Sequence, residues 1–169
     1  MPANTDVRDD GGPAIAGVIA RPILMFPSAL LLGWALEHVL RLPFPVPRVG
    51  LEPWVGAIVG GALILIGIAI FAAGVRGFSR AATPLPTNRP ACALVTTGVY
   101  GWTRNPIYLA FFLGYGGIGM IVHSSWILIL AVPLAVIMRY GVVAREEAYL
   151  ERRFGDAYRD YKARAHRWL

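Results

Sequence analysis

Residues 54–75 form a run of twenty-two amino acids without a single charged side chain. A helix needs about 20 consecutive apolar residues to cross the hydrocarbon core of a bilayer. Inside lipid, a helix also satisfies its own backbone hydrogen bonds, whereas an open segment does not. The run therefore predicts a membrane-spanning helix, and the bilayer rather than water as the solvent for this chain.

Three further apolar segments complete the predicted membrane part. We expect spans at residues 21–40, 107–122 and 126–144, in addition to 54–75. Only residues 123–125 separate the last two spans, so these two helices must form an antiparallel hairpin. Hydrophobic residues make up 56% of the chain, above the roughly 45–50% of soluble domains. The composition agrees with one domain built in the bilayer.

The basic residues set the predicted orientation. The chain carries 16 Lys and Arg against 10 Asp and Glu. The connection between the spans 21–40 and 54–75 holds Arg41 and Arg48, and the turn at 123–125 holds no Lys or Arg. The other basic residues lie in the N-terminal part, in 76–106 and from Arg139 onward. The positive-inside rule therefore puts both termini in the cytoplasm, as in a bacterial-type inner membrane. Basic residues beside apolar spans favour membrane lipids as partners and argue against nucleic acid.

The predicted fold class is an all-α membrane protein with four transmembrane helices, a cytoplasmic cofactor loop and a C-terminal amphipathic cytoplasmic helix. Residues 1–18 are expected to be a flexible cytoplasmic tail, and 19–169 a single integral-membrane domain. Apolar residues recurring at steps of three or four predict the last helix over about 145–166, with a break at Gly155. The connection 76–106 is too apolar for disorder and is expected to fold against the helices. No obligate protein partner is evident.

The sequence lacks the signatures of soluble enzymes. It has no glycine-rich fingerprint, no P-loop and no Cys/His cluster with metal spacing, so no metal site is predicted. Two segments stand out instead, namely residues 94–108 and the adjacent Glu146 and Glu147. Because the third and fourth spans form a hairpin, Tyr108 at the start of one must lie near the two glutamates at the end of the other.

Two ionisable residues, one inside the last span and one just after it, are candidates for function. Glu146 shares a helical face with Leu150 and Phe154, so it faces protein, where a carboxylate needs a partner. Arg139 lies seven residues earlier, two α-helical turns along the same face and inside the span. An ionisable group at such a depth is a functional candidate by default.

Four motifs carry a family resemblance. They are Leu-Val-Thr-Thr-Gly-Val-Tyr at 94–100, Arg-Asn-Pro-Ile-Tyr at 104–108, Glu-Glu-x-x-Leu at 146–150 and Phe-Gly-x-x-Tyr-x-x-Tyr at 154–161. In this order they resemble the C-terminal core of the isoprenylcysteine carboxyl methyltransferase and phospholipid methyltransferase superfamily, over about residues 76–169. The resemblance implies a site for S-adenosyl-L-methionine (SAM) at the cytoplasmic membrane face, with S-adenosyl-L-homocysteine as the product.

The resemblance also implies which residues contact the cofactor. Carried over by position, they are Leu85, Pro86, Leu94, Gly98, Tyr100, Arg104, Asn105, Pro106, Ile107, Tyr108 and Glu146. Two positions depart from the family. Asn105 stands where the motif usually has His, and Val142 stands where the carboxyl-methylating branch has Arg, with Arg139 as the candidate replacement. Aromatic faces and a carboxylate suit the sulfonium cation of SAM.

The predicted function is SAM-dependent methyl transfer to an apolar or lipid-like acceptor, through a carboxylate, amine or thiol. Arg139 and Glu147 are the candidate catalytic residues, with Glu147 as proton acceptor from an amine or thiol. The alternatives are a sterol-reductase-like membrane oxidoreductase with a nicotinamide cofactor, against which the short N-terminal half argues, and a non-catalytic four-helix scaffold. The sequence does not specify the acceptor.

Overall fold

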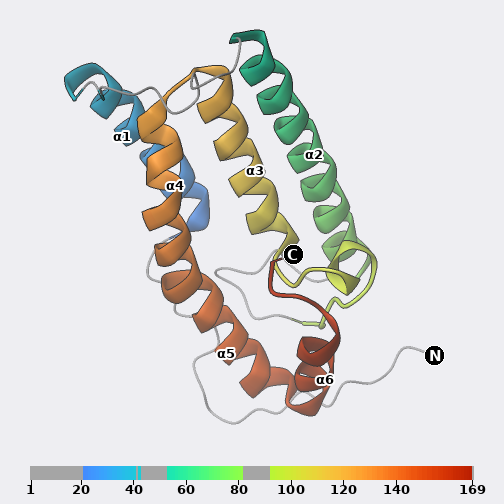
Figure 1. Ribbon diagram of the computed structural model, residues 1–169. Helices are drawn as coiled ribbons and strands as arrows, with labels where there is room; N and C mark the ends of the chain where they lie inside the picture. Colours follow the sequence, from blue (N-terminus) through green and yellow to red (C-terminus); the bar gives the residue numbers. More distant parts are fainter. Residues whose placement is uncertain (1–20, 41, 43–52, 82–91, 169) are drawn as a thin grey trace.

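A computed structural model describes residues 21–40, 42, 53–81 and 92–168 of the chain. Four long helices stand side by side in it (Figure 1), α1 (Pro22–Val39), α2 (Pro53–Arg80), α3 (Pro106–Ile121) and α4 (Ser125–Ile137). The described ranges contain no strand, and one isolated parallel bridge joins Thr103 to His166. The predicted all-α class is thus confirmed for these residues, while the predicted tail at 1–18 lies outside them.

The fourth long helix continues well beyond its predicted end. A π-helical segment, η3 (Met138–Val143), joins α4 to α5 (Ala144–Phe154), so that Ser125–Phe154 is one helix of 30 residues. The predicted boundary between residues 144 and 145 is therefore not a break in the helix. The chain turns at Gly155, whose φ of +52° suits glycine, and continues as α6 (Asp156–Arg164). The predicted break at Gly155 is confirmed.

The protein is an integral membrane protein by the length and apolarity of its helices. Three helices in the described ranges are long and apolar enough to cross a bilayer, Pro22–Val39, Trp54–Arg80 and Ser125–Phe154. The helix Pro106–Ile121 has 16 residues, about 24 Å at about 1.5 Å per residue, so the predicted four spans stay a prediction. The helix α2 ends at Arg80 and not at the predicted Val75. The charged ends of Arg76 and Arg80 can reach water from a helix that continues past the apolar run.

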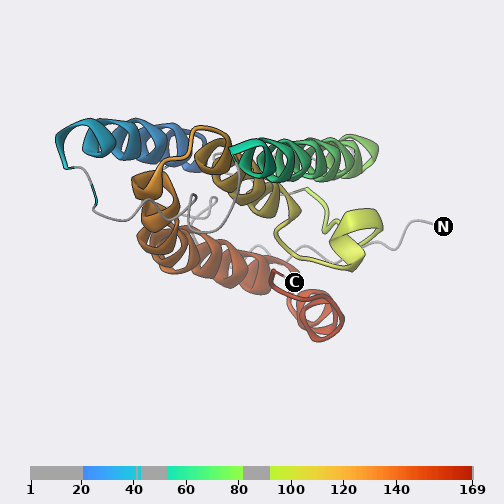
Figure 2. The same ribbon diagram turned by 45° about the horizontal axis from the view of Figure 1, so that its top comes forward.

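Glycines bring α2 and α3 into close contact, and the two helices lie next to each other in Figures 1 and 2. A Cβ atom added at Gly60 would lie 2.5 Å from the carbonyl oxygen of Gly117, and one at Gly117 would lie 2.6 Å from that of Gly60. Small residues at such crossings let helix backbones approach. Gly60 and Gly117 therefore mark the point where the two backbones cross most closely.

The α3–α4 hairpin is held at its turn by α1. The Ser124 hydroxyl accepts from the amide of Ile127 at 3.3 Å and donates to Oε2 of Glu37 at 2.7 Å. The same carboxylate accepts from the backbone amide of Trp126 at 3.3 Å. Away from this turn, the other ends of α3 and of the α4–α5 helix lie apart (Figure 1).

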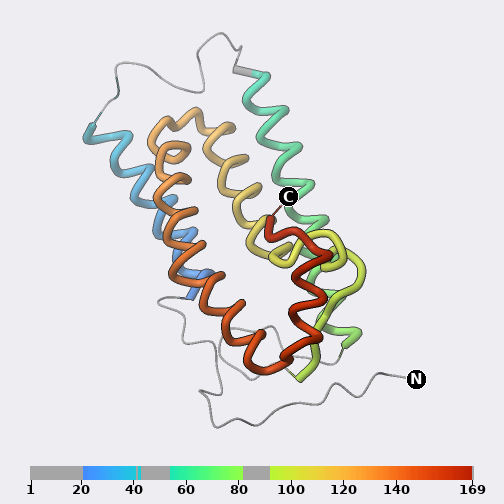
Figure 3. The backbone as a smooth tube through the Cα atoms, turned by 60° about the horizontal axis from the view of Figure 1, so that its bottom comes forward, coloured from blue at the N-terminus to red at the C-terminus, as the bar shows by residue number. Residues whose placement is uncertain are grey.

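The apolar stripe after the fourth span is buried against protein. Tyr149, Phe154, Tyr158, Tyr161 and Ala165 form a buried cluster, against which Leu94 of the 92–105 loop and Leu150 pack. The C-terminal helices therefore dock over the loop. After α6 the chain runs back toward the start of α3 (Figure 3).

Candidate active site

A small, mainly apolar pocket of about 100 Å³ lies where the 92–105 loop meets the start of α3, α5 and α6. Its lining residues are Phe78, Ala93, Leu94, Val95, Tyr100, Arg104, Asn105, Pro106, Ile107, Tyr108, Glu146, Glu147, Leu150, Tyr158 and Tyr161. Segments far apart in sequence therefore converge on one site, as the predicted hairpin requires.

Tyr100 fixes the loop between α2 and α6. The 3-10 helix η2 (Gly98–Gly101) begins at Gly98, whose φ is +64°, a conformation that glycine adopts at little cost. The buried Tyr100 ring packs edge-on against Phe78 at 5.3 Å between centroids. Its carbonyl oxygen accepts a 2.8 Å hydrogen bond from the hydroxyl of Tyr161. Gly98 itself shapes this turn and does not line the pocket.

A tyrosine and a carboxylate face each other at the base of the hairpin. Pro106 begins α3, so Tyr108 projects from its first turn, and its hydroxyl donates to Oε1 of Glu146 at 2.6 Å. This contact confirms the predicted proximity of the two residues. A helix of 30 residues is about 45 Å long, against about 30 Å of hydrocarbon core, so we take the charged residues from Arg145 onward to lie outside it.

The surroundings of Glu146 favour its neutral form. Burial raises the pKa of the Glu146 carboxyl to about 7, and the hydrogen bond from Tyr108 opposes this rise. Across the described residues no Lys, Arg or His forms an ion pair with this carboxyl. A ligand cation placed beside it would supply the missing counter-charge.

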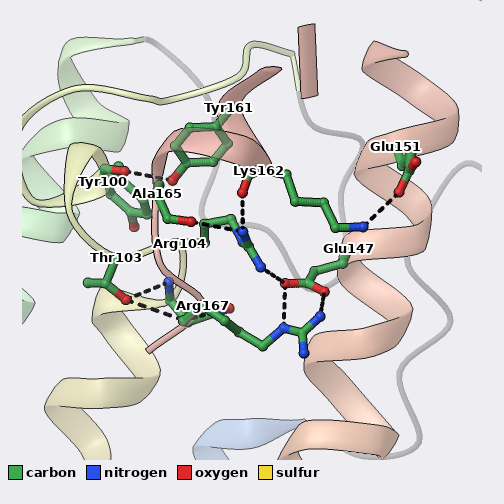
Figure 4. Close-up of polar contacts among 10 residues, drawn as sticks. Tyr100, Thr103, Arg104, Glu147, Glu151, Tyr161, Lys162, Ala165 and Arg167 are labelled. Carbon is green, nitrogen blue, oxygen red and sulfur yellow. Dashed lines mark hydrogen bonds and ion pairs between the residues drawn. The ribbon is translucent and has the colours of Figure 1, made fainter. Parts of the chain in front are cut away.

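The neighbouring Glu147 is in a different setting, between two guanidinium groups (Figure 4). It accepts from Nη2 of Arg104 at 3.0 Å, and from Nε and Nη2 of Arg167 at 2.9 and 2.6 Å. Burial acts to raise the pKa of this carboxyl, but the hydrogen bonds and charges of Arg167 and Arg104 outweigh it and lower the pKa below its usual value. A carboxylate so engaged is a poor proton acceptor, and the geometry makes Glu147 an anchor for the C-terminal segment.

Backbone contacts complete this anchoring. The amide of Arg104 donates to the carbonyl oxygen of His166 at 2.8 Å, and the amide of His166 donates to that of Trp102 at 3.0 Å. The Asn105 side-chain amide donates to the carbonyl oxygen of Arg167 at 2.9 Å. The residues that follow α6 thus hold Arg104 and Asn105 of the pocket lining in place from behind.

Most of the predicted cofactor residues come together. Those that line the pocket are Leu94, Tyr100, Arg104, Asn105, Pro106, Ile107, Tyr108 and Glu146, and their role in binding stays a prediction. Leu85 and Pro86 lie outside the described residues. Val142 is fully buried in the apolar core instead of facing the pocket.

Arg139 lies away from this pocket, in a groove between α3 and α4. Its guanidinium carbon is 5.4 Å from the ring centroid of Tyr140. The expectation that it shares a face with Glu146 assumed regular α-helical turns. The π-helix η3 lies between the two residues, and its i→i+5 hydrogen bonds add a residue to the turn.

Sequence reasoning missed part of the lining. Phe78, Ala93, Val95, Leu150, Tyr158 and Tyr161 were not predicted as site residues, and neither was Arg167. For Leu150, Tyr158 and Tyr161 a signal was present in the apolar stripe that predicted the C-terminal helix. No spacing pattern pointed to Arg167, which reaches the site only because the chain reverses at Gly155.

The fold of this chain is similar to that of a solved membrane protein. The fold matches the solved structure of the eukaryotic intramembrane Ras methyltransferase ICMT (isoprenylcysteine carboxyl methyltransferase) with a TM-score of 0.66 and 19% sequence identity. The match covers 89% of this chain and 54% of that one, so this chain spans about half the length of that relative. Helices that suit a membrane, arranged in this way, give the chain the fold class of that intramembrane protein.

The sequence identifies the family within this class. The phospholipid methyltransferase family matches residues 55–157, more than half of the chain. The chain therefore belongs to the phospholipid methyltransferase family. An uncharacterized protein of Haemophilus influenzae is 63% identical over 27 residues, which are 16% of this chain and 43% of that protein.

Proposed function

We propose that the protein transfers the methyl group of SAM to an apolar or lipid-like acceptor and releases S-adenosyl-L-homocysteine. The pocket around Tyr108 and Glu146 is the proposed SAM site, at the cytoplasmic face of the membrane. The observation that carries the proposal is a partly buried carboxyl in an aromatic pocket, hydrogen-bonded to Tyr108 and without a cationic partner in the described part of the chain.

The chemistry of the pocket fits this cofactor. SAM carries a sulfonium and an ammonium, and aromatic rings and a carboxylate bind such cations. Tyr100, Tyr108 and Tyr158 supply rings, and Glu146 supplies the carboxylate. SAM also carries a carboxylate, and the buried Nε of Arg104 has no hydrogen-bond acceptor among the described residues. This N–H group is a donor for the anionic end of the ligand.

The volume of the pocket is small for a cofactor of this kind. Pockets for ligands of this kind usually measure about 300–1,000 Å³, whereas the present one measures about 100 Å³. The walls must therefore move apart when a nucleoside-sized cofactor enters. The segment after α6 does not line the pocket, but its hydrogen bonds and ion pairs hold Arg104, Asn105 and Glu147 of the lining. Its release would let this wall move.

The residues of the chain would act mainly by binding and positioning. When bound, SAM would supply an electrophilic methyl group to the acceptor. Ionised Glu146, oriented by Tyr108, would hold the cationic end of the cofactor. The apolar side chains of Leu94, Ile107 and Leu150 exclude water from the reacting groups. No proton transfer by Glu147 is needed for a carboxylate or thiolate acceptor.

The basic residues support the proposed cytoplasmic face. The segments on either side of the pocket carry Arg76, Arg80, Arg104, Arg145, Arg152, Arg153, Arg159, Lys162, Arg164 and Arg167. Such a concentration of Lys and Arg marks the cytoplasmic side of a bacterial membrane protein.

A binding experiment tests the cofactor. The full chain, purified in detergent, is titrated with SAM, S-adenosyl-L-homocysteine and NADPH. We expect micromolar binding of the first two and none of the third. A well-folded sample that binds neither SAM nor its product overturns the proposal. Incubation with methyl-labelled SAM and with lipid extracts, prenylated thiols or small thiols then identifies the acceptor.

A further inference from the structure

A groove of about 280 Å³ lies between α1 and α3. Its lining residues are Ile23, Phe26, Pro27, Leu30, Ala110, Phe111, Gly114, Tyr115 and Ile118. Among the described residues it shares no lining side chain with the pocket around Tyr108 and Glu146. The N-terminal half of α1, drawn in blue, passes behind α4 toward α3 in Figure 1. This α1–α3 groove is therefore a separate site, close in volume to the smaller ligand pockets of about 300 Å³.

The α3 wall of the groove holds a hydroxyl group without a partner. Tyr115 is 2% exposed, and its hydroxyl is buried without a hydrogen bond to any of the described residues. The ring of Phe26, whose centroid lies 6.2 Å away, offers it no strong acceptor. Buried polar groups in proteins are nearly always paired, because an unpaired one is costly. The Tyr115 hydroxyl is thus a donor available to a ligand.

The α1 wall holds a matching acceptor. Pro27 lies inside α1 and has no amide hydrogen. The carbonyl oxygen of Ile23, four residues earlier, therefore lacks the donor that a regular α-helix supplies. Both residues line the groove, and the hydrocarbon of a bilayer cannot supply a donor in place of the missing one. One groove thus brings together an unpaired donor and a carbonyl without its helical donor.

We propose that the α1–α3 groove binds an apolar alcohol of the membrane, whose hydroxyl accepts from Tyr115 and donates to the carbonyl oxygen of Ile23. A hydroxyl group both donates and accepts, whereas an ether only accepts and a hydrocarbon does neither. The apolar side chains of the groove suit the hydrocarbon part of such a molecule. No Lys or Arg is among the lining residues, so the groove does not favour an anion.

Matched ligands test the two hydrogen bonds. The full chain in phosphatidylcholine nanodiscs is incubated with tritiated oleyl alcohol, and unlabelled oleyl alcohol, oleyl methyl ether and 9-octadecene compete for it. We expect the alcohol to bind about fivefold more tightly than the ether, and the hydrocarbon to bind more weakly than both. Cholesterol and its methyl ether repeat the comparison for a polycyclic alcohol. Equal affinities within both series overturn the proposal.

Two substitutions assign the partners of the ligand. Y115F removes the donor and should lower the affinity for both the alcohol and the ether about fivefold, without changing that for the hydrocarbon. P27A restores an amide hydrogen opposite the carbonyl oxygen of Ile23 and should remove the preference for the alcohol over the ether. The control Y140F changes an exposed tyrosine outside the groove and should behave as wild type. Wild-type affinities in both Y115F and P27A overturn the proposal.

Two glycines of α3 test the location. A Cβ atom added at Gly114 or at Gly116 would meet nothing within 4 Å, but only Gly114 lines the groove. G114L should therefore fill the groove and lower the binding of tritiated oleyl alcohol about tenfold, while its matched control G116L should keep it. Equal binding in the two variants overturns the groove as the site.

Two further measurements on Y115F check the free protein. Since the variant loses an unpaired hydroxyl, its unfolding temperature in detergent should not fall. A clear fall would show that the hydroxyl has a partner in the free protein, and would overturn its role as the donor. SAM affinity should stay within about twofold of wild type, because Tyr115 does not line the cofactor pocket. A tenfold loss would make the groove part of the cofactor site and overturn its independence.

Discussion

The hydroxyl of Tyr108 donates a 2.6 Å hydrogen bond to the carboxyl of Glu146, which joins the first turn of α3 to the start of α5. The two residues are 38 positions apart in sequence. Their side chains bridge the two helices away from the turn at Ser124. A ligand that binds to Glu146 therefore contacts a carboxyl that already joins these two helices.

Removing the hydroxyl of Tyr108 or the charge of Glu146 should weaken SAM binding. A hydrogen bond to a charged group contributes about 1.5–3 kcal/mol, so Y108F and E146Q should each lower the affinity about tenfold or more. The double variant should lose less than the sum of the single losses, because Tyr108 acts by orienting the charge that E146Q removes. Isothermal titration with SAM measures all four proteins, and far-UV circular dichroism checks the fold. Unchanged affinity in both single variants contradicts the site.

SAM affinity should rise with pH. Burial raises the pKa of Glu146 to about 7, so the carboxyl is largely neutral below this value and ionised above it. We expect binding to strengthen about tenfold between about pH 6 and about pH 8. The stability of the ligand-free protein should change in the opposite sense. Its contribution from Glu146 is fully present below the unfolded pKa and is lost as pH rises through about 7.

The control for this pH profile is E146Q, whose amide does not titrate. Its SAM affinity should vary little over the same range. If the SAM affinity of E146Q changed with pH as steeply as that of the wild-type protein, a group other than Glu146 would be responsible for the pH dependence.

Glu147 should matter more for stability than other acidic residues of the C-terminal helices. Its side chain and that of Arg104 are each 9% exposed, and removing one partner of a buried ion pair costs about 3–5 kcal/mol. E147Q should therefore lower the unfolding temperature clearly. Because the pKa of Glu147 is lowered, the wild-type contribution is present above the unfolded pKa and lost as pH falls through the lowered value.

Glu151 is the matched control for this change. It pairs with Lys162 at 3.2 Å and with Arg159 at 3.4 Å, but on the surface. Exposed ion pairs contribute little, so E151Q should unfold close to wild type in a fluorescence melting experiment. Equal losses in E147Q and E151Q would contradict the anchoring role of Glu147.

Two adjacent glycines of α2 should respond differently to alanine. A Cβ at Gly60 would lie 2.5 Å from the carbonyl oxygen of Gly117, whereas one at Gly61 would meet nothing within 4 Å. G60A must push α2 and α3 apart, and overpacking of this kind costs about 1–3 kcal/mol. G61A should be neutral. Thermal unfolding in the same detergent compares the two, and equal stability would show that the helices do not cross at this point.

Asn105→His should be tolerated. The side-chain amide of Asn105 donates to the carbonyl oxygen of Arg167 at 2.9 Å, and an imidazole N–H can donate in its place. We expect SAM affinity within about threefold of wild type, while Asn105→Leu, which has no donor, should lose about tenfold. If the histidine variant lost as much SAM affinity as the leucine variant, the shape of the side chain at position 105, and not the donated hydrogen bond, would determine the affinity.

The sequence predicted those parts of the site that depend on helix order and on short connections. Only residues 123–125 separate the last two predicted spans, which forces these spans into a hairpin. From this the proximity of Tyr108 to Glu146 follows without any knowledge of side-chain packing. The apolar stripe likewise predicted a helix with a break at Gly155. Regular periodicity and loop length suffice for such features.

The sequence could not predict features that depend on irregular geometry or on contacts after a chain reversal. Arg139 was expected on the same helical face as Glu146 because the prediction assumed regular α-helical turns. The amino-acid composition of Met138–Val143 does not indicate a π-helix. Arg167 reaches Glu147 only after the chain reverses at Gly155. The angle of that reversal depends on packing in three dimensions.

The π-helix lets Ser125–Phe154 hold one residue more than a regular helix without redirecting the side chains that follow. Met138 and Val142 are completely buried on either side of the widened turn, while Tyr140 between them is 64% exposed. Because i→i+5 hydrogen bonds widen the turn by one residue, deleting one residue there would restore ordinary α-helix and leave Glu146 facing Tyr108. Deleting one residue from the regular helix Ser125–Ile137 would instead rotate everything that follows by about 100° and take Glu146 away from Tyr108. Natural relatives should therefore tolerate the loss of one residue within Met138–Val143 and almost never a deletion in the regular helix before it.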